Sequence, residues 1–198
     1  MKIILRQEAF LLCAVLLVLT GCAHRVAFED VRYTIGGQRQ LHTIVAVIDE
    51  ATLAKVVPIR AYMTGIAQSW ETQPGEMLKA VADLELPQMF ERYESATRLP
   101  AADNAVRKLT LVLTIPHYDF SEFHASIRVR AVATATDGKT LFDKVYSGEG
   151  ETQGGKMFLS GAFGMKSAIR QSSLDAYKKI FAQMRTDLAA SVVALPKP

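Results

Sequence analysis

Hydrophobic and polar residues alternate most regularly in the second half of the chain. Leucine or isoleucine occupies every second position from 109 to 115, and a similar alternation returns from Ile127 to Ala135. A period of two residues is typical of half-buried β-strands. Asp137-Gly138 follows the second segment, and this dipeptide favours the positive φ angles of tight hairpin turns. With 141–147 as the returning strand, the pattern predicts an antiparallel meander.

The first half of the folded part predicts a strand, a second possible strand and a helix. The segment 41–48 is short and rich in β-branched residues, which favours a strand. Residues 56–63 could form another, but Pro58 lacks an N–H and restricts it to an edge or to its first residues. Thr72, then Pro74 and Glu76, form a helix start signal. We expect a helix over about 74–94, kinked or broken near Pro87.

The last element is an amphipathic helix, because apolar residues from Ile169 to Leu188 recur at spacings of three and four. Before it lies a glycine-rich passage, 148–164, which also carries large apolar residues. Either the terminal helix begins early and buries them, or the passage is a mobile apolar patch, which on a monomer usually marks an interaction site. Tryptophan is also common at binding hot spots. The candidate partner-binding residues are therefore Phe158, Leu159, Phe163, Met165 and Trp70.

These elements predict an α+β fold: one two-layer domain in which an antiparallel sheet packs on two main helices. We expect this domain to span 41–198. Residues 1–21 read as a leader that is removed, and 22–40 as a polar tether that contains Gly36-Gly37.

The leader has the parts of a bacterial secretory signal. Lys2 and Arg6 supply positive charge, and 9–19 is an apolar run too short to span a bilayer, which needs about 20 residues. Leu19-Thr20-Gly21-Cys22 then matches a lipobox, where cleavage precedes a cysteine that is lipidated. We therefore expect the protein to bind the membrane through lipid on Cys22. The second cysteine, Cys13, leaves with the leader.

Lipidation determines the expected location. Each buried acyl CH2 contributes about 0.8 kcal/mol, so several chains anchor a protein stably. Lipoproteins of this kind carry three acyl chains, palmitate among them, and Asp after the cysteine favours retention at the inner membrane. Because this position is Ala23, we expect the periplasmic face of the outer membrane.

The composition of the chain limits the kinds of partner that we expect it to bind. The net charge is +3, and it falls to +2 once the leader takes away two basic residues and one acid. Nucleic-acid binding usually requires clustered Lys and Arg, so no nucleic acid is expected. Gly150 to Lys156 fits most of a P-loop but has Met157 where a Ser or Thr should bind Mg²⁺. We expect neither a nucleotide nor another cofactor.

One segment carries candidate chemistry. His117, Asp119, Ser121, Glu122 and His124 lie within eight residues, which is enough for a divalent metal site or for the atoms of a catalytic triad. A triad is defined by geometry in the fold, and polar residues in one loop are common. We therefore predict a polar hairpin tip without catalytic or metal-binding residues, and keep an envelope hydrolase or metal-binding protein as the alternative.

The order of these elements allows a resemblance. The lipobox, the meander with 136–140 (Thr-Asp-Gly-Lys-Thr) at its turn, Tyr146-Ser147-Gly148 and the terminal helix resemble YajG-type lipoproteins and the lipoproteins that accompany envelope transporters. The resemblance implies a non-catalytic binding, assembly or accessory component of the cell envelope with an envelope protein as its partner. It supplies no catalytic residue.

Overall fold

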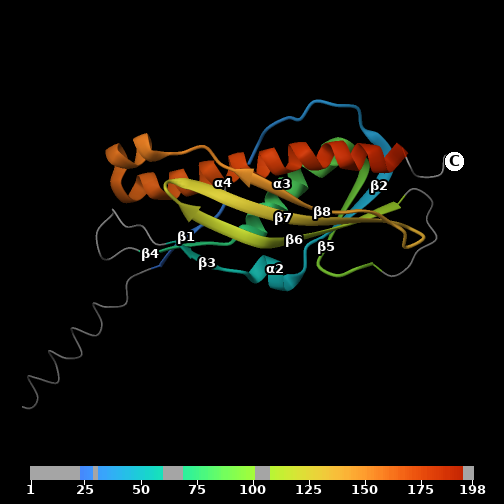
Figure 1. The fold of residues 1–198 in the computed structure, drawn as a ribbon, viewed down its shortest axis with the longest axis horizontal. Helices are drawn as coiled ribbons and strands as arrows, with labels where there is room; N and C mark the ends of the chain where they lie inside the picture. Colours follow the sequence, from blue (N-terminus) through green and yellow to red (C-terminus); the bar gives the residue numbers. More distant parts are fainter. Residues whose placement is uncertain (1–22, 29–30, 60–68, 101–107, 194–198) are drawn as a thin grey trace, which may run out of the picture.

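The computed structural model describes residues 23–28, 31–59, 69–100 and 108–193, with the side chains of Ala23, of Ser69 and of 156–163 excepted. Its elements form an α+β fold, as predicted (Figure 1). In chain order they are β1 (Ala23–Val26), β2 (Gln40–Val47), α2 (Glu50–Ala54), β3 (Val57–Ile59), β4 (Ser69–Thr72), α3 (Pro74–Met89), β5 (Phe90–Ala96), β6 (Lys108–Ser121), β7 (His124–Ala135), β8 (Thr140–Glu149) and α4 (Gly154–Val193).

The main sheet has five strands in the order β5-β2-β6-β7-β8. Strands β6, β7 and β8 pair antiparallel, so the predicted meander is confirmed. Gly138 has a φ of +81°, as the Asp137-Gly138 turn required. Strand β2, however, is parallel to both β5 and β6, so the sheet is mixed and not wholly antiparallel. Helix α3 lies between β2 and β5 in the chain and supplies the crossover that parallel strands need.

A smaller sheet has the order β1-β4-β3. Its edge strand β3 contains Pro58, which agrees with the restriction of proline to an edge. Strand β1 begins at Ala23 and runs parallel to β4, with Ala23 opposite Ser69 and Val26 opposite Thr72. Val26 is fully buried. The chain is therefore part of the folded body from the residue that follows Cys22.

Helices α3 and α4 pack on the main sheet, and α4 extends along the molecule's long axis (Figure 1). The alternate residues Leu109, Leu111 and Leu113 of β6 are fully buried in the core, as are the alternate residues Ile127, Val129 and Ala131 of β7. At the end of β8 the chain approaches α4 very closely. A Cβ on Gly150 would lie 1.9 Å from the carbonyl oxygen of Ser172. Only glycine permits this approach.

One expectation about helices is corrected, and one open alternative is decided for the backbone. The helix predicted over 74–94 ends at Met89, and Phe90 and Tyr93 belong to strand β5. The helix continues for two residues past Pro87, and the backbone N–H of Phe90 then bonds to the carbonyl of Leu86. Of the two alternatives for 148–164, the early helix is correct for the backbone, because α4 begins at Gly154. Among the described helices, none is long and apolar enough to cross a bilayer.

Candidate functional site

Residues 27–39, here called the N-terminal strap, connect β1 to β2 without helix or strand in their described part. Figure 1 shows the strap passing along the helical side, from the end that carries β1 to the end where β2 begins. We predicted a tether over 22–40, but this segment is fastened to the body. Tyr177 of α4 packs edge-on against Phe28, with 6.2 Å between ring centroids. The strap differs from a tether because aromatic and polar side chains near its start and middle bind it to the helices.

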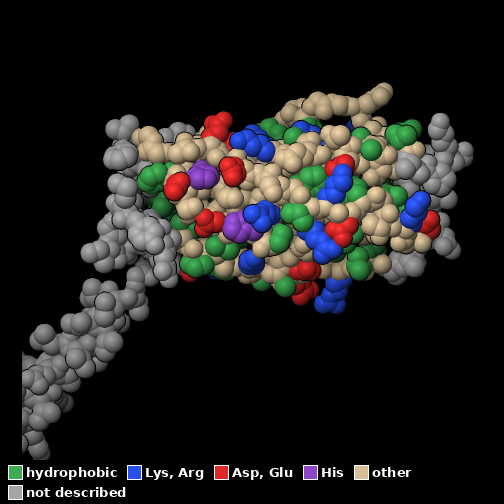
Figure 2. Space-filling model, viewed as in Figure 1, with side chains coloured by type: hydrophobic (Ala, Val, Ile, Leu, Met, Phe, Trp, Pro, Cys, Tyr) green, Lys and Arg blue, Asp and Glu red, His purple; other side chains and the backbone are tan. Residues whose placement is uncertain are grey.

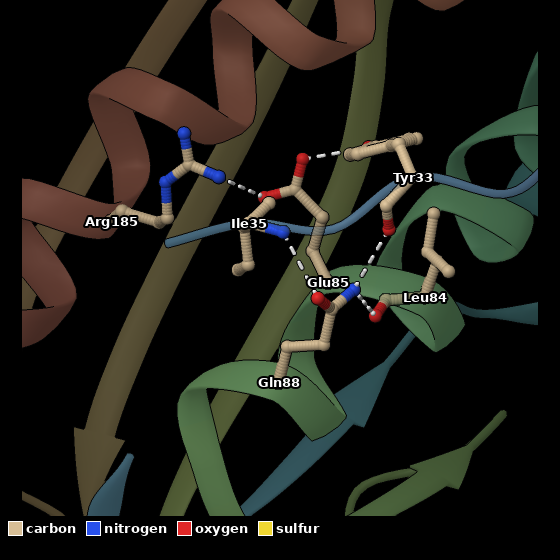
Figure 3. Close-up of polar contacts among 6 residues, drawn as sticks. All are labelled: Tyr33, Ile35, Leu84, Glu85, Gln88 and Arg185. Carbon is tan, nitrogen blue, oxygen red and sulfur yellow. Dashed lines mark hydrogen bonds and ion pairs between the residues drawn. The ribbon is translucent and has the colours of Figure 1, made fainter. Parts of the chain in front are cut away.

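The strap is held at its middle by a buried carboxylate (Figure 3). The phenol of Tyr33 donates a hydrogen bond of 2.7 Å to Oε1 of Glu85 on α3. The guanidinium of Arg185 on α4 donates one of 2.9 Å to Oε2. The side chain of Glu85 is 1 % exposed. A buried charge is tolerated only when it is paired and hydrogen-bonded, and here both oxygens are. These three residues, called the Glu85 cluster, join strap, α3 and α4.

Burial controls the protonation of this cluster. Loss of solvation raises the pKa of the Glu85 carboxyl above its usual value, although the bonds from Tyr33 and Arg185 and the charge of Lys178 act in the opposite direction. Burial, followed by the hydrogen bond to Glu85 and its charge, also raises the pKa of the Tyr33 phenol. The phenol therefore remains a neutral donor at physiological pH.

Backbone groups of the strap are bound by the end of α3. The side chain of Gln88 accepts the N–H of Ile35 at 3.0 Å and donates to the carbonyl of Tyr33 at 3.3 Å (Figure 3). Arg39 donates from Nε to the carbonyl of Pro87 at 3.1 Å. The last carbonyls of a helix have no partner within the helix, so an arginine is a suitable donor there.

A groove of about 520 Å³ lies between the strap and α4, and we call it the strap groove. Four of its residues are basic and one, Asp175, is acidic. Lys178 belongs both to the groove and to the surroundings of the Glu85 cluster, since its Nζ lies 4.4 Å from the centroid of the Tyr33 ring. Its lining comprises Phe28, Val31, Arg32, Lys166, Ser167, Arg170, Gln171, Leu174, Asp175 and Lys178.

Asp175 is a polar group in the wall of this groove. Burial, and to a lesser degree the charge of Glu151, raise the pKa of its carboxyl above the usual value. Its Oδ2 atom is buried and has no hydrogen-bond partner among the described residues. The strap groove thus combines basic side chains, one carboxyl that is easier to protonate than usual, and apolar surface.

The segment 117–124 forms a hairpin tip, as predicted, but most of it lies in the two strands. Residues 117–121 belong to β6 and His124 to β7, so only Glu122 and Phe123 form the turn. Their φ angles are +49° and +64°, which are typical of a two-residue type I′ hairpin. The tip is therefore a tight turn, and its residues are arranged by strand pairing.

This pairing brings together some of the candidate triad atoms, in an order that does not match a triad. Asp119 accepts a hydrogen bond of 2.6 Å from Ser121, and Ser121 lies opposite His124 in the strand register. In a working triad the acid holds the histidine, and the histidine contacts the serine. Here the Nδ1 atom of His124 lies 3.5 Å from the carbonyl oxygen of Glu122. Among the described residues, no three His, Cys, Asp or Glu side chains converge to hold a metal ion.

Two of the residues predicted to bind a partner, Met165 and Trp70, lie in the core. Met165 is 2 % exposed and Trp70 is 4 % exposed. Trp70 lies against His24 of β1, with 4.9 Å between ring centroids. The side chains of Phe158, Leu159 and Phe163 lie outside the described part, although their backbone is in α4. Their role stays a prediction, as does lipidation of Cys22, which also lies outside it.

Sequence reasoning missed Tyr33, Glu85 and Arg185. One signal could have indicated the cluster, because Glu85 continues the buried stripe of α3 at the spacing i, i+3, i+4, i+7 from Leu78, Val81 and Ala82. A charged residue in an apolar helical stripe requires a buried partner. The partners themselves are 52 and 100 positions away, and no local pattern relates them to Glu85.

The face of the molecule drawn in Figure 2 is mixed in charge. Figure 2 shows Lys, Arg, Asp and Glu side chains interspersed over the face in view. Exposed Arg130 and Asp143, opposite charges 2.6 Å apart on β7 and β8, are one such pair. Such exposed pairs contribute little to stability.

No family model matches the sequence, and no curated protein matches it. Among the solved structures that are similar in part are two bacterial proteins. The hypothetical protein CT253 from Chlamydia trachomatis has a TM-score of 0.42 and 8% identity, covering 75% of this chain and 99% of that one. Protein XCC0632 from Xanthomonas campestris, described as DUF330, has a TM-score of 0.38 and 13% identity, covering 83% and 96%. The chain is thus similar to two bacterial proteins at a level that carries no inference about function.

Proposed function

We propose that the protein is a lipid-anchored component of the bacterial envelope, on the periplasmic face of the outer membrane, that binds another envelope protein without catalysing a reaction. The observation that carries this proposal is the lipobox ending at Cys22, after a leader with a positive start and a short apolar run. The finer resemblance to YajG-type lipoproteins is part of the same proposal.

The fold supports a binding role close to the membrane. Ala23 is already in β1, so no flexible spacer separates the proposed lipid from the domain. The strap groove offers a concave surface with both apolar and charged residues, which is the composition of a binding site. The alternative of an envelope hydrolase gains no support from β6 and β7, where the acid bonds to the serine and all three side chains lie near an exposed hairpin tip.

The two cysteines provide a matched experiment. We would express the wild type, Cys22→Ser and Cys13→Ser from the native leader, and measure intact mass and partition into detergent. The wild type and Cys13→Ser should lose residues 1–21, gain the mass of the lipid and enter the detergent phase. Cys22→Ser should keep the leader and lack the lipid. If Cys22→Ser had the same mass and the same partition as the wild type, the proposal would be wrong.

A further inference from the structure

The two edges of the main sheet are covered differently. Strand β8 forms one edge, and two side chains of α4 bind its backbone. The Nζ atom of Lys179 donates to the carbonyl of Glu149 at 2.7 Å, and Nε2 of Gln183 donates to the carbonyl of Ser147 at 3.0 Å. A helix that covers a sheet edge prevents another strand from adding there. The β8 edge is therefore closed.

Strand β5 forms the opposite edge, and in the part of the chain that the structure describes it pairs with β2 alone. Four of its seven residues are exposed, namely Glu91, Arg92, Glu94 and Ser95. An edge strand presents N–H and C=O groups on its outer side, onto which a strand of another chain can add. The main sheet can therefore be extended at β5, whereas it is closed at β8.

The sequence of β5 is complementary to itself when two copies pair antiparallel. A two-fold axis perpendicular to the sheet would relate the copies, so opposite residues must lie on the same face. Residues 92 and 94 share a face, because side chains alternate along a strand. With Tyr93 on the axis, Arg92 of each copy lies opposite Glu94 of the other. Opposite charges in such positions stabilise strand pairing.

The neighbouring registers that keep the faces matched lack this complementarity. One places Arg92 opposite itself and the other places Glu94 opposite itself, and like charges directly opposite are destabilising. Glu94 lies 3.8 Å from Lys108 of its own chain, but its side chain is 57 % exposed, so the carboxylate can accept a second cation without losing the first. The charges of β5 thus favour a single register.

We propose that the protein forms a symmetric dimer in which the β5 strands of two copies pair antiparallel about Tyr93. The five strands of each copy then form one continuous sheet, which ends on both sides at a β8 edge covered by α4. The assembly is closed, because the same edge is used in both copies. The two-fold axis also keeps both Cys22 residues at the same height, so both proposed lipids can enter one bilayer. The dimer goes beyond the proposed function and does not depend on the lipid.

The test uses the full-length protein in detergent, with micelles in excess so that two copies rarely share one by chance. Sedimentation should show the wild type changing from monomer to dimer as protein concentration rises. Arg92→Glu makes both cross-strand pairs acidic and Glu94→Arg makes both basic, so each variant alone should dimerise at least about fivefold more weakly. Arg128→Glu makes the same change in charge as Arg92→Glu at an exposed position of β7, and should match the wild type within about twofold.

An equal mixture of Arg92→Glu and Glu94→Arg is the decisive sample. In a mixed dimer the acidic pair of side chains on one copy lies opposite the basic pair on the other, so both cross-strand contacts again join opposite charges. The mixture should therefore dimerise within about threefold of the wild type, although neither variant does so alone. A general effect of charge or of lost stability would not be repaired by mixing.

Cross-linking checks the register. In Tyr93→Cys the two thiols lie opposite each other, with Cα atoms about 4.5–5.5 Å apart, which a disulfide can bridge. In Ser95→Cys they are offset by four residues, or about 13 Å, which is too far. Mild oxidation should cross-link the first variant and not the second, with the wild type as the blank. Tyr93→Cys also removes the hydrogen bond from the phenol to Asp83. If melting shows that it is unfolded, the charge variants alone decide.

Several outcomes would overturn the inference. A wild type that stays monomeric at every concentration would do so, as would unchanged dimerisation of both charge variants or a mixture that dimerises no better than either variant alone. A disulfide dimer of Ser95→Cys without one of folded Tyr93→Cys would exclude this register. The mass of the Cys22→Ser protein is independent of all these results, so failure of the anchor and failure of the dimer are distinguishable.

Discussion

The hydroxyl of Tyr33 donates to the carboxylate of Glu85 at 2.7 Å, and this bond ties the strap to α3 across 52 positions of sequence. Tyr33→Phe removes the donor and leaves Oε1 of the buried Glu85 carboxylate without this hydrogen bond. A hydrogen bond to a charged group contributes about 1.5–3 kcal/mol. We expect the free energy of unfolding, measured in urea, to fall by about that amount, and the amide of Ile35 to exchange its hydrogen faster.

Thr34→Ala is the control for this substitution, because Thr34 is an exposed neighbour in the same strap. Surface changes of this kind usually alter stability by less than about 0.5 kcal/mol. Equal effects of Tyr33→Phe and Thr34→Ala would contradict the role of the Glu85 cluster in holding the strap.

The protonation of Glu85 predicts a pH dependence of stability. Because burial raises the pKa of Glu85 in the folded protein, the folded state binds its proton more tightly than the unfolded state does. The contribution of this group to stability therefore increases as pH falls through the raised pKa, and is complete below the ordinary value. The phenol of Tyr33, the guanidinium of Arg185 and the ammonium of Lys178 are the groups that act on this carboxyl.

Glu85→Gln removes this titration, so its measurement isolates the effect. We expect the stability of the wild type relative to Glu85→Gln to rise as the pH is lowered from 8 to 5 in urea-unfolding experiments. Hydrogen bonds from Arg130 and Lys144 lower the pKa values of Asp143 and Asp187, respectively. Protonation of these two carboxylates at low pH destabilises the wild type and Glu85→Gln alike. A difference that does not change with pH would show that Glu85 does not titrate in this range.

Gly150 supports a prediction about close packing. A Cβ at this position would overlap the backbone of α4 at Ser172, and relief of such an overlap typically costs about 1–3 kcal/mol. Gly150→Ala should lower the melting temperature. In contrast, Gly155 lies in α4, and a Cβ added there would meet no described atom within 4 Å beyond its chain neighbours and the helix's own backbone. Gly155→Ala should be neutral or stabilising by up to about 1 kcal/mol. The reverse order of the two melting temperatures would contradict this packing.

The turn at Glu122 and Phe123 is a place where the protein can be stabilised. A residue other than glycine at positive φ costs about 1–2 kcal/mol. Glu122 is exposed and has a φ of +49°, so Glu122→Gly should raise the free energy of unfolding by up to about 1 kcal/mol after the entropy of glycine is counted. Glu91→Gly, at an exposed position in β5, should instead lower it. A loss of stability in both variants would mean that Glu122 makes an interaction worth more than the strain.

Ala23 tests the proposed location. By the resemblance to lipoproteins, Ala23→Asp should move the protein from the outer-membrane to the inner-membrane fraction of a sucrose gradient, while Ala23→Ser should not. If the wild type were already in the inner-membrane fraction, or if Ala23→Asp stayed with it in the outer one, the sorting part of the proposal would fail.

Local sequence patterns predicted local structure well. The alternation of Leu109 to Ile115 and the Asp137-Gly138 turn identified the meander, because strand faces and turn angles depend on neighbours in sequence. Strand direction is different, since alternation is the same in parallel and antiparallel strands. Phe90 shows the same limit of local sequence patterns. Its apolar spacing fits a helix, but pairing with β2 places it in a strand.

The site was harder to predict for a similar reason. The strap is polar and aperiodic, which is also true of a flexible tether, and only long-range partners distinguish the two. Tyr33 looks like an ordinary exposed residue until Glu85 is known to be buried beside it. Met165 and Trp70 illustrate the opposite case, because large apolar residues fit both a core and an interface, and the structure places these two in the core.

If Cys22 carries lipid in the membrane, as proposed, the direct passage into β1 keeps the domain next to the bilayer. Helix α4 has 40 residues, which corresponds to about 60 Å. The domain then stays within a hemisphere of that radius around its anchor, and a partner confined to the same hemisphere meets it at a local concentration of about 4 mM. At such a concentration even a contact with millimolar affinity is substantially occupied, so weak binding along the side of α4 is sufficient for a partner in the same membrane.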